Sequence, residues 1–268
     1  NIDRAQVNLI ILLLLLFFSY YLLNNKESLA GVYLGIAAVF KLTPVLFLVY
    51  LLIKKRFKAI MSAIITFTAL IFIPSFRWGI ERNAYFLKGW ARSLGATLPS
   101  EYLQHKNQSL MAAISRFFSV NSDVALLKLS QTPLAVLMII FYALFLVSLI
   151  YMVIKSGQNQ GGPKTQYDLA LFFTAMTVLS PVGTKTTFVY LLMPIAVLIK
   201  EVFMRELKDR ILLGGLLTYL SLIYLNSSDI IGGELSELLH KYSLMTLGLL
   251  IIYFLLGYAK LKKSPAAF

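Results

Sequence analysis

The sequence predicts an all-α, polytopic transmembrane protein, and three features lead to this fold class. Of the 268 residues, 59% are hydrophobic and 14% are charged, and the mean hydropathy is +0.77. Soluble domains carry about 25% charged residues. Apolar stretches recur along the whole chain with no polar domain between them. We therefore expect residues 1–268 to form a single helical membrane domain.

The distribution of charge favours a membrane topology over a nucleic-acid partner. The chain has 25 Lys and Arg against 12 Asp and Glu. The basic residues cluster beside apolar spans, at 54–58, 200–210 and 260–263. Such clusters are typical of cytoplasmic flanks, so we expect a multi-pass protein of the inner (plasma) membrane. There is no cysteine, which excludes thiol nucleophiles and thiolate metal sites. Without a metal motif or a nucleotide-binding phosphate loop, we expect no metal and no cofactor.

About nine helical segments are expected, and the first of them pose a question of topology. Residues 6–23 form an apolar span of about 27 Å, followed by a turn at 24–28. The stretch 29–53 contains Lys41, Thr43 and Pro44, and Pro44 disfavours helix at Thr43. This stretch is either one kinked helix or a hairpin of two short helices. The hairpin, which we favour, puts turn 24–28 and cluster 54–58 inside and Lys41 at the outer surface.

The rest of the chain alternates between the two sides. Residues 58–74 lead outwards into a long outer loop, 75–131, in which Trp78 and Trp90 mix with Arg82 and Lys88. Such a mixture suits helices lying in the headgroup region. Further helices are expected at 133–154, 167–180, 188–199, 211–225 and 243–258. Connectors 181–187 and 226–241 then face outside, and 156–166 faces inside.

The candidate site starts from Lys41, because an ionised side chain within an apolar stretch must face protein, water or a bound anion. With the hairpin topology, a set of polar residues lies at the outer side: Gln6, Asn8, Lys41, Asn107, Gln108, Ser109, Thr184, Lys185 and Thr186. Ammonium groups pair with a phosphate, while amides and hydroxyls bond a sugar. We therefore expect Lys41 and Lys185 to bind a donor phosphate and the others to bind substrate.

Several of these residues also have a simpler interpretation. Lys41 is also interpreted as a lysine snorkelling to the interface. Asn107 or Ser109 could cap a helix over residues 109–117. Gln6 and Asn8 could be ordinary interfacial polar residues.

Four phrases of the sequence, taken together, resemble a known family. They are Gln6-Val7-Asn8, the stretch Gly35–Leu48, Asn107-Gln108-Ser109-Leu110 and Leu179-Ser180-Pro181. In this order they are similar to the bacterial polyprenyl-phosphate-mannose-dependent mannosyltransferases of the phosphatidylinositol mannoside type, in the GT-C superfamily. The resemblance covers most of residues 5–200.

The resemblance implies a GT-C-type bundle that transfers a hexose, mannose by analogy, from a polyprenyl-phosphate donor to a lipid or glycan acceptor on the extracytoplasmic face. Its partners are these two substrates and membrane lipids. The family's general base is a carboxylate in the first outer loop, which we expect upstream of Asn1 together with the first helices. Relatives carry histidine where this chain has Thr184-Lys185-Thr186-Thr187. This departure puts the sugar and the acceptor in doubt and raises the question whether Lys185 supplies the positive charge.

Two other classes of protein remain as alternatives. A transporter or flippase of a lipid-linked sugar needs polar residues at mid-membrane depth. The threonines at that depth are Thr66, Thr68, Thr174 and Thr177, which can bond their own helix backbone. The third alternative is a membrane subunit that only scaffolds a partner.

Overall fold

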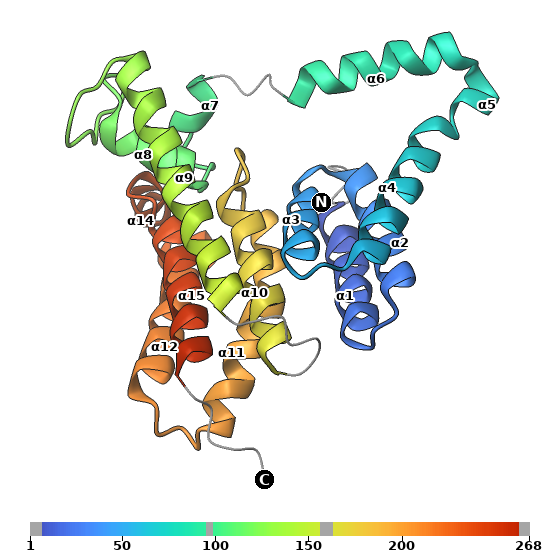
Figure 1. The fold of residues 1–268 in the computed structure, drawn as a ribbon. Coiled ribbons are helices and arrows are strands. Elements are labelled where there is room, and N and C mark those ends of the chain that lie inside the picture. The colour runs from blue at the N-terminus through green and yellow to red at the C-terminus, as the bar shows by residue number, and fades with distance from the viewer. Residues whose placement is uncertain (1–6, 95–98, 156–162, 263–268) are drawn as a thin grey trace. The chain divides into compact units, whose positions relative to one another are not determined.

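The computed structural model describes residues 7–94, 99–155 and 163–262, and most of this part of the chain is helical (Figure 1). The predicted all-α fold is thereby confirmed. By its internal contacts the chain divides into two compact units. Unit 1 contains the described residues up to 94, and unit 2 contains 99–155 and 163–262. That residues 1–268 form one membrane domain stays a prediction.

Unit 1 is built from apolar helices followed by a polar one. They are α1 (Asn8–Leu23), α2 (Glu27–Phe40), the 3-10 helix η2 (Thr43–Val45), α3 (Leu46–Ile53), α4 (Phe57–Phe72), α5 (Ser75–Trp78) and α6 (Ile80–Leu94). In α1, Ile11, Leu15, Phe18 and Leu22 recur at helical spacing and are buried, which is the pattern of a packed helix face. The face of α1 toward α2 therefore forms part of the core of unit 1.

Two glycines allow α2 and α4 to approach each other closely. A Cβ atom on Gly31 would lie 2.2 Å from the backbone oxygen of Ala59, and one on Gly35 would lie 2.6 Å from that of Ala63. Small residues four apart on both helices make backbone-to-backbone packing possible in membrane proteins. The register also shows that α2 and α4 run parallel, because Gly31 and Gly35 meet successive turns of α4.

The chain is interrupted at Lys41 as expected. Helix α2 ends at Phe40, Lys41 is extended with φ −158° and ψ 138°, and η2 starts at Thr43. Pro44 sits in the first turn of η2, where its missing N–H costs nothing, and it prevents α2 from continuing through Thr43. The stretch 29–53 therefore contains two separate helices, not one kinked helix.

The turns on either side of this pair of helices meet at one end of unit 1. The Arg56 guanidinium donates to Glu27 Oε1 at 2.8 Å and to Asn25 Oδ1 at 3.2 Å. The turn before α2 and the turn after α3 thus lie together, with Lys41 at the other ends of both helices. This arrangement confirms the hairpin.

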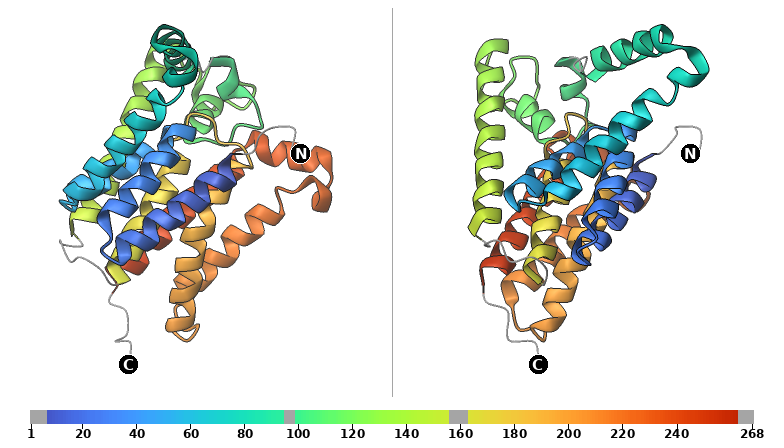
Figure 2. Two further views of the ribbon diagram at one scale, coloured as in Figure 1. Left: turned by 90° about the vertical axis from the view of Figure 1, so that its right-hand side faces the viewer. Right: turned by 45° about the vertical axis from the view of Figure 1, so that its right-hand side comes forward.

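The segment after α4 turns a sharp corner. Gly79 has φ +80° between α5 and α6, a conformation that glycine adopts without strain. The Asn83 side chain donates to the backbone oxygen of Ile71 at 3.0 Å and to Ser75 Oγ at 2.9 Å. These bonds fix α6 so that it runs crosswise to α4 and α5 (Figures 1 and 2).

Unit 2 contains the remaining helices. They are α7 (Pro99–Leu103), α8 (Leu110–Phe118), α9 (Gln131–Lys155), α10 (Pro163–Val178), the 3-10 helix η3 (Thr187–Leu191), α11 (Leu192–Met204), α12 (Arg210–Tyr224), α13 (Ser228–Ile231), α14 (Gly233–Lys241) and α15 (Leu244–Leu261). Helix α10 is central, with residues 169–173 fully buried. Helix α15 packs against α10, α11 and α12.

Lipid-exposed faces and helix lengths identify a membrane protein. Four helical stretches are long and apolar enough to cross a membrane: Phe57–Trp78, Gln131–Lys155, Thr187–Met204 and Leu244–Leu261. On α9, Ile139, Leu144 and Val147 are more than 60% exposed. A continuous apolar face of this kind is unfavourable in water but is solvated by lipid tails.

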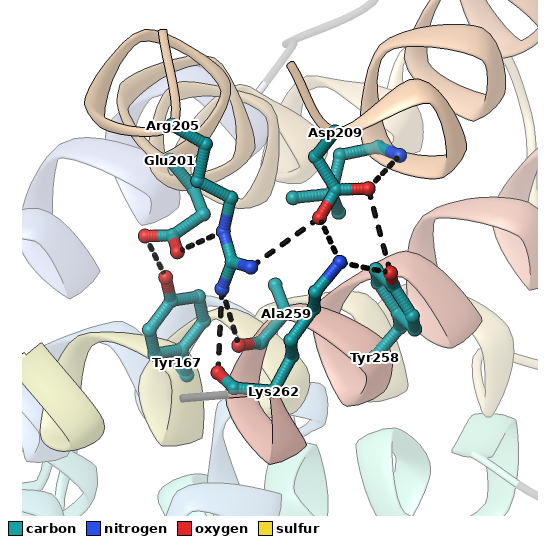
Figure 3. A network of polar contacts seen from close by, with 8 residues as sticks. Tyr167, Glu201, Arg205, Asp209, Tyr258, Ala259 and Lys262 are labelled. Carbon is teal, nitrogen blue, oxygen red and sulfur yellow. Dashed lines mark hydrogen bonds and ion pairs between the residues drawn. The ribbon is translucent and has the colours of Figure 1, made fainter. Parts of the chain in front are cut away.

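A buried network of charged side chains lies at one end of unit 2 (Figure 3). Arg205 Nε donates to Glu201 Oε1 at 2.7 Å, and Arg205 Nη1 donates to Asp209 Oδ2 at 3.3 Å. Tyr167 donates to Glu201, and Lys262 Nζ bonds Asp209 Oδ2 at 3.0 Å. Glu201, Arg205 and Asp209 are each less than 10% exposed. The network therefore ties α10, α11 and the end of α15 together.

Candidate functional site

The candidate residues of unit 1 meet at the end opposite Arg56. Lys41 Nζ donates to Asn8 Oδ1 at 3.4 Å. This hydrogen bond connects the turn after α2 to the first residue of α1. Lys41 is half-buried in this turn. Gln6 lies outside the described residues. The structure thus places Lys41 and Asn8 in one polar cluster at the end of apolar helices.

The candidate residues of unit 2 join two loops, and Asn107 is the central one. Its Oδ1 accepts from the backbone N–H of Ser109 at 3.1 Å and of Gly183 at 2.9 Å. Its Nδ2 donates to the backbone oxygen of Pro181 at 3.2 Å. Asn107 is 3% exposed. Its amide is therefore used to attach the connector that follows α10 to the start of α8.

Gln108 and Ser109 complete this attachment. Ser109 caps α8 by accepting from the backbone N–H of Ala112 at 3.1 Å, and its hydroxyl donates to Pro181 O at 3.1 Å. The simpler interpretation of Ser109 as a helix cap is thus confirmed. Gln108 Nε2 donates to the backbone oxygen of His240 at 2.8 Å. Gln108 is 1% exposed, and its Oε1 is buried without a hydrogen-bond partner among the described residues.

The attached connector presents the polar residues that sequence reasoning placed there. Gly183 lies so close to the other loop that a Cβ atom would be 2.8 Å from the backbone nitrogen of Ser109. Beyond it, Thr184 Oγ1 and Thr186 Oγ1 are hydrogen-bonded at 2.9 Å, and both residues are half-buried. Lys185 is exposed, and its ammonium donates to the backbone oxygen of Asn226 at 3.1 Å. The connector therefore has a fixed base and an accessible, positively charged tip.

Two basic residues of this end of unit 2 were not among the predicted site residues: Arg116 was missed, and His240 was interpreted as a solvated surface histidine. Arg116 is 2% exposed, and it bonds the Ser243 hydroxyl and the backbone oxygens of Gln104 and Asn107. Within the described ranges no carboxylate forms an ion pair with it, and burial lowers its pKa to about 10. Burial, with Lys185 and Arg116 nearby, also lowers the pKa of His240. This end of unit 2 therefore holds a buried guanidinium whose hydrogen-bond acceptors are uncharged.

Sequence signals for these two residues differ in strength. Arg116 interrupts the apolar run of residues 110–118, so its burial could have been suspected. His240 is followed by Lys241 in a polar stretch and resembles a solvated histidine. Its half-buried position follows from Gln108, which no local pattern indicates.

The structure therefore brings the candidates together in two clusters, Lys41 with Asn8 in unit 1, and residues 107–109 with 184–186 in unit 2. In unit 2 this cluster lies at the end opposite the buried network of Arg205, since α10, α11 and α15 run between the two ends. Over residues 7–94, 99–155 and 163–262, no three His, Asp or Glu side chains are grouped as metal ligands.

The comparison with models of known protein families gives a match. A family model described as glycosyltransferase family 87 matches residues 1–181, which is more than half of the chain. The matched region includes Asn8, Lys41 and residues 107–109, whereas residues 184–186 follow it. Searches of curated proteins and of solved structures found no match.

Proposed function

Since the chain belongs to glycosyltransferase family 87 and is a membrane glycosyltransferase, we propose that its donor is a polyprenyl-phosphate-linked hexose. The sugar is mannose, by the resemblance in sequence to mannosyltransferases, and the acceptor is a lipid or glycan. The reaction takes place on the extracytoplasmic face of the inner membrane. A donor that is itself a lipid suits a chain whose described residues include spans and exposed apolar faces.

The observation that carries the proposal is the position of Lys41. Its ammonium lies in a turn between apolar helices, held by Asn8 at 3.4 Å. A cation at such a place needs an anion, water or protein partners to offset the cost of leaving water. A lipid-linked phosphate approaches from the membrane and meets the turn between α2 and η2. Lys41 therefore suits the donor phosphate better than a soluble nucleotide.

These residues would act mainly by electrostatics. The acceptor oxygen forms a bond to the anomeric carbon from the face opposite the phosphate, and the bond between that carbon and the phosphate oxygen breaks. The proton of the acceptor hydroxyl goes to a carboxylate base, and the electron pair leaves with the phosphate. Lys41 then stabilises the negative charge that collects on the phosphate, which lowers the barrier because the ammonium is already in position.

The cluster in unit 2 contains groups of the kinds that bind phosphates and sugars. Lys185 offers an accessible ammonium, and Thr184 and Thr186 offer hydroxyls beside it. Gln108 is 1% exposed and donates to the backbone oxygens of His105 and His240, so it supports the loop beside these groups. Asn107 and Ser109 act as positioning residues, because their side-chain bonds go to the backbone of the two loops.

The proposed sidedness follows from the basic turns. In unit 1, Arg56 and its neighbours lie at the end away from Lys41, and in unit 2 Arg205 lies at the end away from Lys185. Basic residues stay on the cytoplasmic side. The chain has no cysteine, so single-cysteine variants are easily compared. We expect an impermeant maleimide to label Lys26→Cys and Lys208→Cys only from the cytoplasm and Lys106→Cys only from outside. Labelling of Lys26→Cys and Lys106→Cys from the same side would contradict the proposed topology.

A transfer assay tests the function. The purified protein in proteoliposomes receives radiolabelled polyprenyl-phosphate-mannose and lipids extracted from bacterial membranes. We expect label in a new acceptor product and none from a nucleotide-linked mannose, because the phosphate-binding turn faces the membrane. The rival transporter would move the lipid-linked sugar across the bilayer with its bond intact. Flipping without an acceptor product would overturn the proposal in favour of that rival.

One contact pattern already favours the enzyme over the transporter. Thr174 Oγ1 donates to Ala170 O at 2.9 Å, and Thr177 Oγ1 donates to Phe173 O at 3.2 Å. Both hydroxyls therefore form hydrogen bonds to the backbone of α10, as expected. They do not provide the polar path that a sugar would need through the membrane.

A further inference from the structure

We propose that α6 lies in the headgroup layer of the membrane and binds anionic phospholipids. The first argument is the geometry of the corner. The candidate span Phe57–Trp78 has 22 residues, which gives about 33 Å, enough for a hydrocarbon core of about 30 Å. Asn83 and Gly79 fix α6 crosswise at the end of this span. A helix placed crosswise at the end of a span lies along the membrane surface.

The second argument is the distribution of side chains around α6. Ile80, Ala84, Leu87 and Ala91 recur at helical spacing and form an apolar face. Within residues 80–93, Asn83 is the only buried side chain, and Ile80 is 74% exposed. An amphipathic helix with an exposed apolar face and aromatic and basic flanks is typical of interfacial helices. Lipid tails are the partner that an apolar face beside a membrane span meets.

The third argument is charge, which selects anionic headgroups. Residues 75–94 contain only one acid, Glu81, and four basic residues, namely Arg77, Arg82, Lys88 and Arg92. Basic residues alternate with aromatic rings along the exposed surface of α6, at Tyr85, Phe86, Lys88, Trp90 and Arg92. Basic groups bind lipid phosphates, and aromatic rings settle at headgroup depth. This surface of α6 therefore suits the headgroups of anionic phospholipids.

This contact would set the depth of the whole of unit 1. Because α2 and α4 are locked by Gly31 and Gly35 in parallel register, Lys41 lies near the level of Ile71, below the corner at Gly79. Asn83 of α6 bonds the backbone oxygen of Ile71 at 3.0 Å, so a headgroup-bound α6 holds Lys41 close to the headgroup layer.

Tryptophan fluorescence tests the proposal directly, because Trp78 and Trp90 are the two tryptophans of the chain. The whole chain is reconstituted in mixed bilayers with lipids that carry a nitroxide either near the headgroup or deep in the tail. We expect stronger quenching by the shallow nitroxide, and the variants Trp78→Phe and Trp90→Phe report each position alone. Quenching of Trp90 by aqueous iodide but by neither lipid would place α6 in water and overturn the proposal.

A second comparison tests the preference for anionic lipids. At equal mole fraction, brominated phosphatidylglycerol should quench Trp90 at least about twofold more than brominated phosphatidylcholine, since each basic residue near the surface adds attraction. The double variant Lys88→Gln/Arg92→Gln should abolish this ratio. The matched variant Lys55→Gln/Lys58→Gln, which removes two exposed lysines from the other end of unit 1, should keep it.

Salt provides an independent check, because 1 M salt shortens the screening length to about 3 Å and should reduce the ratio toward one. Equal quenching by the two lipids at low salt would contradict the proposal. Preferential quenching by a brominated polyprenyl phosphate over brominated phosphatidylglycerol would also overturn it, because α6 would then bind the donor lipid.

Discussion

Replacing Lys41 by glutamine is expected to reduce kcat/KM for transfer from polyprenyl-phosphate-mannose by about 100-fold or more, the usual cost of losing one preorganised group that stabilises developing charge. Glutamine keeps much of the length of the side chain and can still bond Asn8. The variant therefore removes the positive charge while disturbing the turn little. The measurement is initial rates in proteoliposomes at several donor concentrations.

The division of this loss between kcat and KM distinguishes two roles. If Lys41 stabilises the leaving phosphate, kcat falls, because the charge grows in the transition state. If Lys41 only binds the donor, KM rises with kcat unchanged. We expect both effects, with the larger one in kcat.

Lys26→Gln is the matched control for this experiment. Lys26 is exposed just before α2, at the opposite end of the same helix, so its variant should keep the activity of the unaltered protein. If the kcat/KM of Lys41→Gln is within about threefold of the wild-type value, the transition state has lost no more than RT ln 3 of stabilisation. Lys41 would then be a snorkelling lysine, and the phosphate would have to be bound elsewhere.

The interruption at Lys41 could be predicted because its cause is local. Pro44 restricts the residue before it, and a lysine in an apolar stretch marks a place where helix ends meet water or a partner. The close packing of α2 on α4 was missed, although Gly31 and Gly35 have the spacing that permits it. Spacing alone does not name the partner helix, and the pairing depends on the folded hairpin.

The roles of residues 107–109 could not be settled from sequence for a related reason. An Asn-Gln-Ser phrase before a helix predicts a cap, and Ser109 is one. The same phrase also matched a substrate-binding motif. What decides between these is the position of Gly183 and His240, more than 70 residues further along the chain. Contacts of that range follow from tertiary packing, which a local pattern does not contain.

Replacing Arg205 by methionine is expected to destabilise the folded protein by about 3–5 kcal/mol, the usual effect of removing one partner from a buried ion pair. Glu201 and Asp209 are each about 5% exposed in their side chains, so their charges would remain buried with fewer partners. The variant would also lose the bonds from Arg205 to the backbone oxygens of Ala259 and Lys262. The end of α15 would therefore loosen from α11. The measurement is the free energy of unfolding in mixed micelles.

Lys208→Met is the matched control, since Lys208 lies in the same turn and pairs with Glu206, and both side chains are more than 70% exposed. Its removal should leave the unfolding midpoint unchanged, because exposed ion pairs contribute little. The double variant Glu201→Gln/Arg205→Met should recover part of the loss, since it removes a carboxylate that Arg205→Met leaves without its cation, while Asp209 keeps Lys262.

Equal stability of Arg205→Met and Lys208→Met would show that the buried network contributes nothing to stability beyond what an apolar side chain of similar size supplies. Methionine can fill much of the space of the arginine stem, and a whole buried ion pair can often be replaced by apolar residues without loss of stability. The structure argues against it here, because four acceptors from three segments converge on one guanidinium. Methionine offers no hydrogen bond to any of them, and each unpaired buried acceptor costs free energy.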